Sequence, residues 1–156
     1  MSTCHLAQVN IARMLAPLEE PLMAGFVARL DEINALADRS PGFVWRLQTD
    51  AGNATYLRPY EDNRIIVNLS VWESVEHLKE FVYRSAHAEL MRGRNQWFEK
   101  FDGPYMALWW LKVGHIPTVE EAKERLDHLR KHGECEFAFS FKRVYAPQAY
   151  ESTHSR

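Results

Sequence analysis

The 156-residue chain is poor in cysteine and has no long apolar run. Its two cysteines, Cys4 and Cys135, form no CxxC motif, so the sequence indicates no disulfide framework, and a reducing cytoplasm is the expected compartment. No apolar stretch approaches the roughly 20 residues that cross a bilayer. The first residues also lack the basic region and apolar core of a signal peptide. We therefore expect a cytoplasmic protein with no membrane partner.

The chain also has no excess of charge of either sign. The chain has 19 Lys and Arg against 21 Asp and Glu, a net charge of −2. Nucleic acids and anionic membranes are bound by basic patches, so neither is an expected partner. Internal repeats, low-complexity tracts and linkers are absent too. We expect one domain over residues 4–145, followed by a C-terminal tail, 146–156.

Aromatic residues are abundant by contrast. The chain contains five Trp, six Tyr and eight Phe. Side chains of this size must be buried in a core, at an interface or around a ligand. The four tryptophans Trp72, Trp97, Trp109 and Trp110 can sandwich a planar ligand or can serve as core and interface anchors.

The first half of the chain alternates in the manner of β-strands around one helix. Apolar residues at three and four spacing predict the helix, which begins after Pro21 and ends before Gly42. In the second strand, Phe43, Trp45 and Leu47 are expected on one face. The predicted elements are a strand 4–14, a helix 23–37, a strand 43–48, a hairpin connection 51–63 and a strand 65–72.

A long helical pattern begins near Ser74, a good N-cap residue. Its first half turns one apolar face inward, and its second half, from Tyr83 to Phe98, presents a different face. We predict a bend or break near Tyr83–Ser85, where Ser85 can cap a second segment. The alternative is one straight helix that is buried on two sides.

The remaining elements complete a sheet. Residues 105–113 are apolar on both faces, which predicts a strand that is central or at an interface. Thr118 and Glu121 form a capping box at the start of a helix that ends at Gly133. Residues 137–145 alternate and predict a last strand that closes the sheet.

The order of these elements predicts an α+β fold. Its first six elements match the ferredoxin-like split βαβ arrangement, with helices on one face of the sheet. The other face would be open, so it must be polar or must pair with a second copy. Because the chain is rich in aromatic residues, we favour pairing and expect a homodimer.

One segment carries a family resemblance. The stretch VNLSVWESVEHLKEFVYRSAHAEL resembles the dimeric α+β barrel superfamily, which includes antibiotic-biosynthesis and heme-degrading monooxygenases. With LAQVNIARM, SPGFVWRL and WWLKVGHIPT, nearly all of residues 4–145 is similar to the bacterial domain-of-unknown-function family numbered thirty-two ninety-one. The resemblance implies the fold and the dimer.

Heme is the cofactor that the resemblance suggests. Heme-degrading members have an asparagine on the first strand, a tryptophan on the second helix and a histidine that ligates the iron. Asn10 can match the asparagine, but Phe81 stands at the tryptophan position. His87 lies several residues short of the ligand position. The resemblance therefore implies either heme, with its iron on His87, or no cofactor.

Two groups of residues are the candidates for a site. His87, Asn10 and Arg46 are the candidate catalytic residues, because an imidazole can ligate iron or act as a base and polar groups can orient a ligand. Alternatively, His87 is hydrogen-bonded at the core edge or dimer seam, and the polar strand residues face solvent. The candidate cofactor-binding residues are His87, Tyr83, Phe81, Trp72, Asn68 and Trp110.

Two other arrangements are weaker. His128 and His132 have the i, i+4 spacing of zinc ligands, but no third strong ligand is evident, and cations near a helix C-terminus are favoured anyway. His115 can face the mouth of a pocket.

The preferred hypothesis is a small monooxygenase-like enzyme that acts on an aromatic or polyketide-like metabolite. The alternatives are a non-catalytic small-ligand or heme binding protein and a structural dimer without chemistry.

Overall fold

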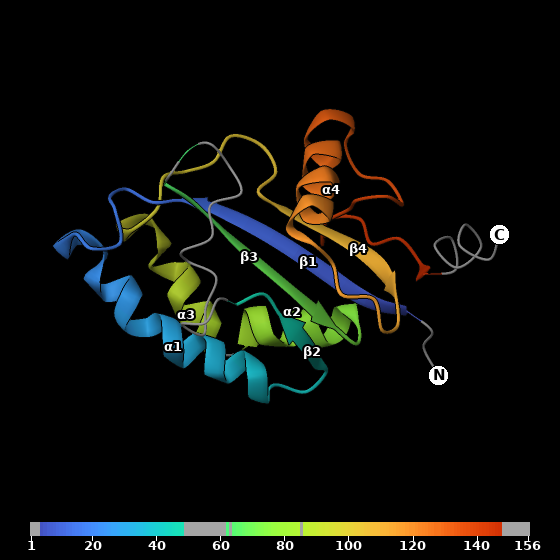
Figure 1. Cartoon of the computed structure of the whole chain (residues 1–156), viewed down its shortest axis with the longest axis horizontal. Coiled ribbons are helices and arrows are strands. Elements are labelled where there is room, and N and C mark those ends of the chain that lie inside the picture. Colours follow the sequence, from blue (N-terminus) through green and yellow to red (C-terminus); the bar gives the residue numbers. More distant parts are fainter. Residues whose placement is uncertain (1–3, 49–61, 63, 85, 148–156) are drawn as a thin grey trace.

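The structure is a computed structural model that describes residues 4–48, 62, 64–84 and 86–147, without the side chains of residues 86, 87 and 90. In the described chain, four strands form an antiparallel sheet in the order β2-β3-β1-β4 (Figure 1). This order and the β-α-β-β-α-β sequence define a ferredoxin-like α+β fold, as predicted. The strands are β1 (Cys4–Arg13), β2 (Phe43–Arg46), β3 (Ile65–Trp72) and β4 (Met106–Lys112).

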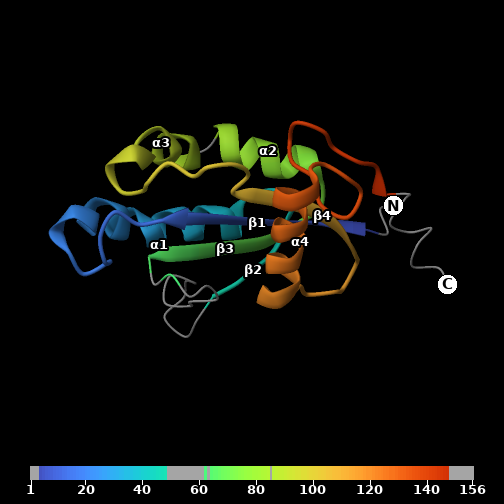
Figure 2. The same cartoon turned by 90° about the horizontal axis from the view of Figure 1, so that it is seen from above.

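Of the four described α-helices, α1, α2 and α3 lie on one side of the sheet and α4 lies on the other (Figures 1 and 2). Of the two helices in the long helical pattern, α2 ends at Arg84 and α3 begins at Ala86, while Ser85 lies outside the described residues, so the break at this position stays a prediction. The helices are α1 (Ala24–Arg39) after the 3-10 turn η1 (Pro21–Met23), α2 (Val75–Arg84), α3 (Ala86–Arg92) before η2 (Arg94–Gln96), and α4 (Val119–His132).

The second helical segment is shorter than the sequence pattern predicts. It ends at Arg92, where Gly93 follows. Trp97 and Phe98 lie beyond η2 and pack around Phe26, with ring centroids 6.0 and 4.9 Å from its ring. These two aromatics therefore belong to a small core cluster beneath α1 and not to a helical face.

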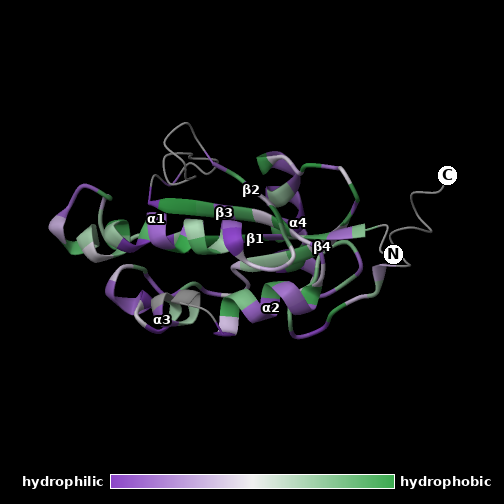
Figure 3. Cartoon of the chain, turned by 90° about the horizontal axis from the view of Figure 1, so that it is seen from below, coloured by the Kyte–Doolittle hydropathy of each residue, from purple (hydrophilic) through white to green (hydrophobic). Residues whose placement is uncertain are grey.

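The alternation of β1 sends its side chains into two cores. Ala7 and Val9 are fully buried with Leu126 of α4. Leu6 is buried on the opposite face with Leu78 of α2. Hydrophobic residues accordingly dominate β3, whereas α1 and α2 mix hydrophobic and hydrophilic positions (Figure 3). Each face of the sheet is a helix-covered core.

The sheet face expected to be open is covered within one chain. On this face Val9, Leu69 and Val71 are each at most 1% exposed, and Leu126 and Leu129 of α4 belong to the same cluster. The described residues thus leave no bare apolar sheet face that would require a second copy. The homodimer therefore stays a prediction, and an open sheet face no longer supports it.

The face assignment of β2 was wrong at its first residue. The pairing of β2 with β3 shifts register between Phe43 and Trp45. Phe43 consequently packs edge-on against Trp72, at 5.5 Å between ring centroids, while Trp45 packs into the opposite core. A bulge puts an extra residue into one strand and so reverses the alternation. Gly42, at φ +79°, precedes this irregular strand.

Strand β4 lies at the edge of the sheet, whereas its two apolar faces predicted a strand that is central or at an interface. It pairs only with β1 along its length. One face is covered by α4, and the other joins the core beneath α2. Burial on both faces therefore comes from two layers of cover and not from two neighbouring strands.

The predicted last strand, residues 137–145, is not a strand. Phe139 makes an isolated bridge with Leu108 of β4, with N–H to carbonyl distances of 2.7 and 2.9 Å in the two directions. Just after it, Glu134 Oε1 accepts hydrogen bonds from Ser140 N at 3.0 Å and from Ser140 Oγ at 2.6 Å. The carboxylate takes the polar groups that would continue a ladder, so the chain turns.

The start of α4 is anchored to the sheet. Thr118 Oγ1 accepts from Glu121 N at 3.0 Å, as the capping box predicts. The Glu121 side chain turns to other partners: its Oε2 accepts from Trp109 Nε1 at 2.9 Å, and its Oε1 lies 2.8 Å from His115 Nε2. Burial raises the pKa of Glu121, but the hydrogen bonds from His115 and Trp109 and the charges of His115 and Arg125 outweigh it, so the net pKa is lowered.

This carboxylate predicts a pH effect on stability. Because the folded-state pKa lies below the ordinary value of 4.5, Glu121 stabilises the fold above that value and loses its contribution as the pH falls through the folded pKa. Glu121→Gln is expected to be less stable than wild type near neutral pH, and the difference should shrink on acidification below 4.5. Urea unfolding at a series of pH values measures this. Glu120→Gln, at an exposed neighbour, is the control, and a pH-independent difference would contradict the prediction.

Three further predictions concern a membrane span, the hairpin connection and the C-terminal tail. Of the described helices, none is both long and apolar enough to span a bilayer. The expected hairpin connection, residues 51–63, lies outside the described residues except for Asp62. The tail lies outside them from residue 148 onward.

Candidate functional site

A cavity of about 550 Å³ lies between the sheet and the helices α1, α2 and α3. Its floor is the face of β1 and β3 that carries Gln8, Asn10, Asn68 and Ser70. Most of its other described lining is apolar. Those other residues are Ile11, Ala12, Phe26, Leu30, Ile33, Asn34, Ala37, Arg46, Leu47, Ile66, Val67, Leu78, Phe81, Val82, Tyr83, Ala88, Met91, Arg92, Arg94, Phe98, Tyr105, Met106 and Phe141.

The floor carries a hydrogen-bonded row of neutral polar side chains, which we call the amide ladder: Asn10, Gln8, Asn68 and Ser70. Register places Gln8 opposite Ser70 and Asn10 opposite Asn68. Gln8 Nε2 donates to Asn68 Oδ1 at 2.7 Å and to Ser70 Oγ at 2.8 Å, and Gln8 Oε1 accepts from Asn10 Nδ2 at 2.9 Å. Gln8 is only 4% exposed, so these bonds satisfy a buried amide.

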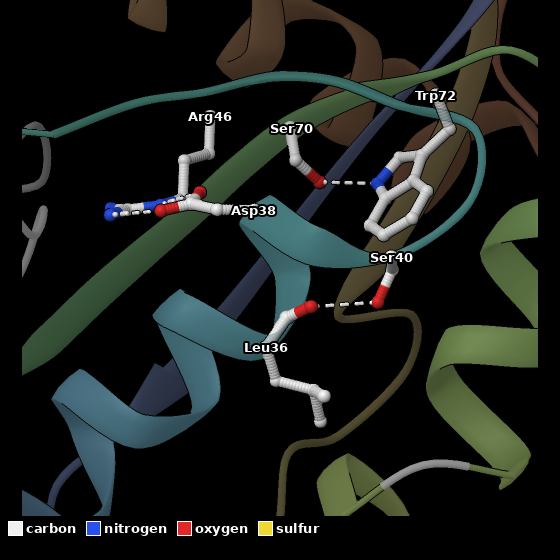
Figure 4. Close-up of polar contacts among 6 residues, drawn as sticks. All are labelled: Leu36, Asp38, Ser40, Arg46, Ser70 and Trp72. Atoms are coloured by element: carbon white, nitrogen blue, oxygen red, sulfur yellow. Dashed lines mark hydrogen bonds and ion pairs between the residues drawn. The ribbon is translucent and has the colours of Figure 1, made fainter.

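The ladder retains hydrogen-bonding capacity. Ser70 Oγ also accepts from Trp72 Nε1 at 2.9 Å (Figure 4), so both its lone pairs are used and its own hydrogen is left. Among the described residues, nothing pairs with Asn68 Nδ2 or Asn10 Oδ1. Gln8 thus orients its neighbours, and their remaining donors and acceptor are available at the cavity floor.

Aromatic side chains form much of the cavity wall. Phe26 and Phe98 meet edge to face at one end, and Phe81 lies against Trp72 with centroids 5.1 Å apart. Tyr83 of α2 faces Phe141 of the C-terminal segment at 5.8 Å. Apolar walls with a few convergent polar groups are typical of small-molecule binding sites.

Arginine supplies all the charge in the described lining. Arg46 Nε donates to Asp38 Oδ1 at 2.8 Å and its second nitrogen contacts Oδ2 at 3.3 Å (Figure 4). Arg94 donates to the Tyr105 hydroxyl at 3.0 Å and lies 4.6 Å from the centre of that ring. Arg92 is the third arginine. No carboxylate lines the described part of the cavity.

The structure brings five of the predicted site residues to this cavity: Asn10, Arg46, Asn68, Phe81 and Tyr83. They come from β1, β2, β3 and α2, which the fold draws together around one space. Arg46 is held by Asp38, so it is oriented before any ligand arrives. The roles of these residues in binding or catalysis stay predictions.

Two predicted tryptophans are elsewhere. Trp72 is 1% exposed and reaches the site only through its bond to Ser70. Trp110 donates to the carbonyl of Tyr145 at 2.8 Å and packs in the core. Trp109 is buried on the opposite face of the sheet. None of these three is in the described lining, so they do not sandwich a ligand there.

His87 belongs to α3, but its side chain lies outside the described part of the structure. Its neighbour Ala88 and the residue four positions later, Met91, both line the cavity. The helix that carries His87 is therefore part of the site, and the role of the imidazole stays a prediction.

The lining residues that sequence reasoning missed include Gln8, Arg92, Arg94 and Tyr105. Gln8 shares the strand parity of Asn10, which is a signal that was available. The two arginines follow the predicted break in the helix, where the spacing pattern ends, so the sequence indicated no face for them.

The alternative metal arrangement finds no support. His128 and His132 stack with ring centroids 4.6 Å apart, and Cys135 Sγ lies 3.6 Å from His128 Nδ1. In the described part of the chain, no group of three or more His, Cys, Asp or Glu side chains can hold a metal ion. His115 bonds to Glu121 beside α4 and does not face the described cavity.

The known structures to which the chain is similar are distant. A protein from Pseudomonas aeruginosa is 14% identical, with a TM-score of 0.47 over 72% of this chain and 95% of that one. SnoaB, a cofactor-independent oxygenase from Streptomyces nogalater, has the same identity, coverage and score. A heme-degrading protein from Mycobacterium tuberculosis is 15% identical, with a TM-score of 0.38 over 75% of this chain and 99% of that one. Likeness at this level does not extend to activity.

Sequence comparison identifies the family. No curated protein matches the chain. The family described as Domain of unknown function (DUF3291) matches residues 5–155, which is nearly the whole chain and covers every described strand and helix except the first residue of β1. The chain belongs to this family.

Proposed function

We propose that the cavity binds a small aromatic or polyketide-like metabolite and that the protein is a monooxygenase-like enzyme acting on it. The amide ladder is the observation that carries this proposal. It is a rigid row of neutral donors and acceptors beneath aromatic walls, in a cavity whose volume of about 550 Å³ suits one drug-sized molecule.

The ladder suits a substrate that passes through an enolate or phenolate. The remaining donors, Asn68 Nδ2 and the Ser70 hydroxyl, can hydrogen-bond an oxygen on which negative charge develops. Preoriented donors of this kind stabilise an oxyanion because they need no reorganisation when the charge forms. Gln8 supplies the orientation through its two donated bonds.

His87 is the proposed base. It would take a proton from a ring methylene group and so form the enolate. With molecular oxygen as co-substrate, the methylene becomes a carbonyl: two C–H bonds break, one oxygen atom is incorporated and the other leaves as water. The substrate supplies the electrons, and the proton on His87 returns with the departing oxygen. Asn10 and Arg46 would orient polar groups of the substrate.

The described lining of the cavity does not supply a ligand for heme iron. The described lining contains no histidine or cysteine, the side chains that most often ligate heme iron. The Tyr105 hydroxyl is already bonded to Arg94, and Tyr83 is 60% exposed. The described residues therefore do not form a heme site by themselves.

Oxidation of 1,8-dihydroxyanthrone to its anthraquinone tests the proposal. The protein is expected to accelerate quinone formation above the spontaneous rate in air and to lose that acceleration without oxygen. His87→Ala should lower the catalysed rate by about 100-fold, since a general base contributes at least that much. Formation of the coloured product follows the rate.

The exposed histidine His132, on the far side of the sheet, gives the control variant His132→Ala.

A non-catalytic binding protein is the second candidate, favoured by the lack of a carboxylate, imidazole or thiol in the described lining. Thermal stabilisation by the anthrone with no faster oxidation would establish that alternative, because a ligand of the native state raises its stability. If the anthrone gives neither stabilisation nor faster oxidation, both candidates are removed.

A further inference from the structure

The charges around the cavity are unbalanced. Three arginines line its described part and no described carboxylate does. Arg46 is neutralised by the bidentate pair with Asp38. Arg92 and Arg94 have no such counter-ion among the described residues, and these two positive charges stand only two positions apart at one end of the cavity.

Carboxylates near these arginines are engaged elsewhere. Glu89, three positions before Arg92 on α3, lies 3.8 Å from Arg29. Glu99 lies 3.4 Å from Arg13. Among the described residues, Arg92 has no partner at all, and Arg94 bonds only to a neutral hydroxyl and its ring. Arg92 is exposed and Arg94 is half-buried, and guanidinium groups that line a cavity can pair with an anionic ligand.

The arginines lie at a definite end of the amide ladder. Arg94 is held by Tyr105, whose carbonyl accepts from Ile11 N at 2.9 Å, and Met106 pairs with Asn10. The arginine end therefore adjoins Asn10. Ser70, opposite Gln8, lies two strand positions further on, roughly 7 Å along the sheet. That separation is comparable with the length of a fused bicyclic ring.

We propose that the ligand of this cavity is an aromatic carboxylic acid, bound with its carboxylate at Arg92 and Arg94 and with a hydroxyl or carbonyl oxygen at Ser70 and Asn68. This inference rests on the proposed function of the cavity and names its ligand class. Arginine pairs with a carboxylate through two parallel hydrogen bonds, which also sets the direction in which the ring lies across the ladder.

Two probes separate charge from shape: 6-hydroxy-2-naphthoate and its methyl ester. Their own fluorescence reports binding to the full-length protein at neutral pH. The acid is expected to bind at least about tenfold more tightly than the ester, as a charged hydrogen-bonded pair warrants. Arg92→Gln and Arg94→Gln should each remove about that factor for the acid and leave the ester unchanged. Arg92→Lys should recover part of the loss.

Arg84→Gln is the matched control, because Arg84 is 77% exposed, lies 3.8 Å from Glu80 and does not line the cavity. Higher salt should weaken binding of the acid and not of the ester. Equal affinities of acid and ester, or an acid affinity insensitive to both arginine variants, would overturn the inference and leave the cavity proposal standing. If neither probe binds although 1,8-dihydroxyanthrone stabilises the protein, the ligand class alone fails; if none of the three compounds binds, the proposed function fails as well.

Discussion

Replacing Trp109 with alanine is expected to lower the free energy of unfolding by about 3–5 kcal/mol, the usual cost of removing a buried tryptophan. Trp109 is fully buried and lies in the core between the sheet and α4. Its ring contributes apolar area to that core, and its Nε1 donates to Glu121 at the start of the helix. The substitution therefore leaves a large cavity and a carboxylate with one partner fewer. Urea unfolding followed by circular dichroism measures the loss.

Trp109→Phe separates the two contributions. Phenylalanine keeps most of the ring but cannot bond to Glu121, so a loss of about 1–2 kcal/mol is expected. The half-buried Trp97 gives a second comparison through Trp97→Ala, which should cost less than Trp109→Ala. A loss below about 1 kcal/mol for Trp109→Ala would show that α4 and its core contribute little to stability.

Gln8→Leu is expected to have the largest effect on the site. Leucine matches glutamine roughly in shape but removes the amide that bonds to Asn10, Asn68 and Ser70. Freed of Gln8, these side chains are no longer held in one orientation. The catalysed oxidation of 1,8-dihydroxyanthrone should fall by about 100-fold, as when an oxyanion donor is lost. Stability should fall by about 1–3 kcal/mol because buried polar atoms lose partners.

Gln48→Leu is the control. Gln48 is exposed just beyond β2, so this substitution makes the same chemical change outside the cavity. It should leave both the rate and the stability close to wild type. An unchanged oxidation rate in Gln8→Leu, in a protein that still folds, would mean that the ladder does not take part in the reaction.

The C-terminal segment illustrates the limit of periodicity. Residues 137–145 alternate like a strand, yet only Phe139 bridges β4. The Glu134 carboxylate, which binds both polar groups of Ser140, turns the chain instead. This contact is between a loop carboxylate and a residue six positions later, and no alternation pattern reports it. Its consequence reaches the site, because Phe141 then lies against Tyr83 at the cavity.

The sequence by itself determined most of the elements and the faces of β1 and β3. Local alternation and helical spacing depend on neighbouring residues, so β1, β3, α1 and α4 could be predicted from them. The same parity indicated Asn10, Arg46 and Asn68 as residues of one polar face. The ferredoxin-like fold followed from the order of the elements.

Only the tertiary structure decided which side chains meet. Register pairs Gln8 with Ser70 and so creates the amide ladder, and a one-residue shift would have sent these groups to different faces. The bulge in β2, the position of α4 on the second face and the return of the C-terminal segment are likewise long-range. Each depends on contacts between residues distant in the chain, and a single sequence carries no direct signal of such contacts. The cavity with its unbalanced arginines exists because of them.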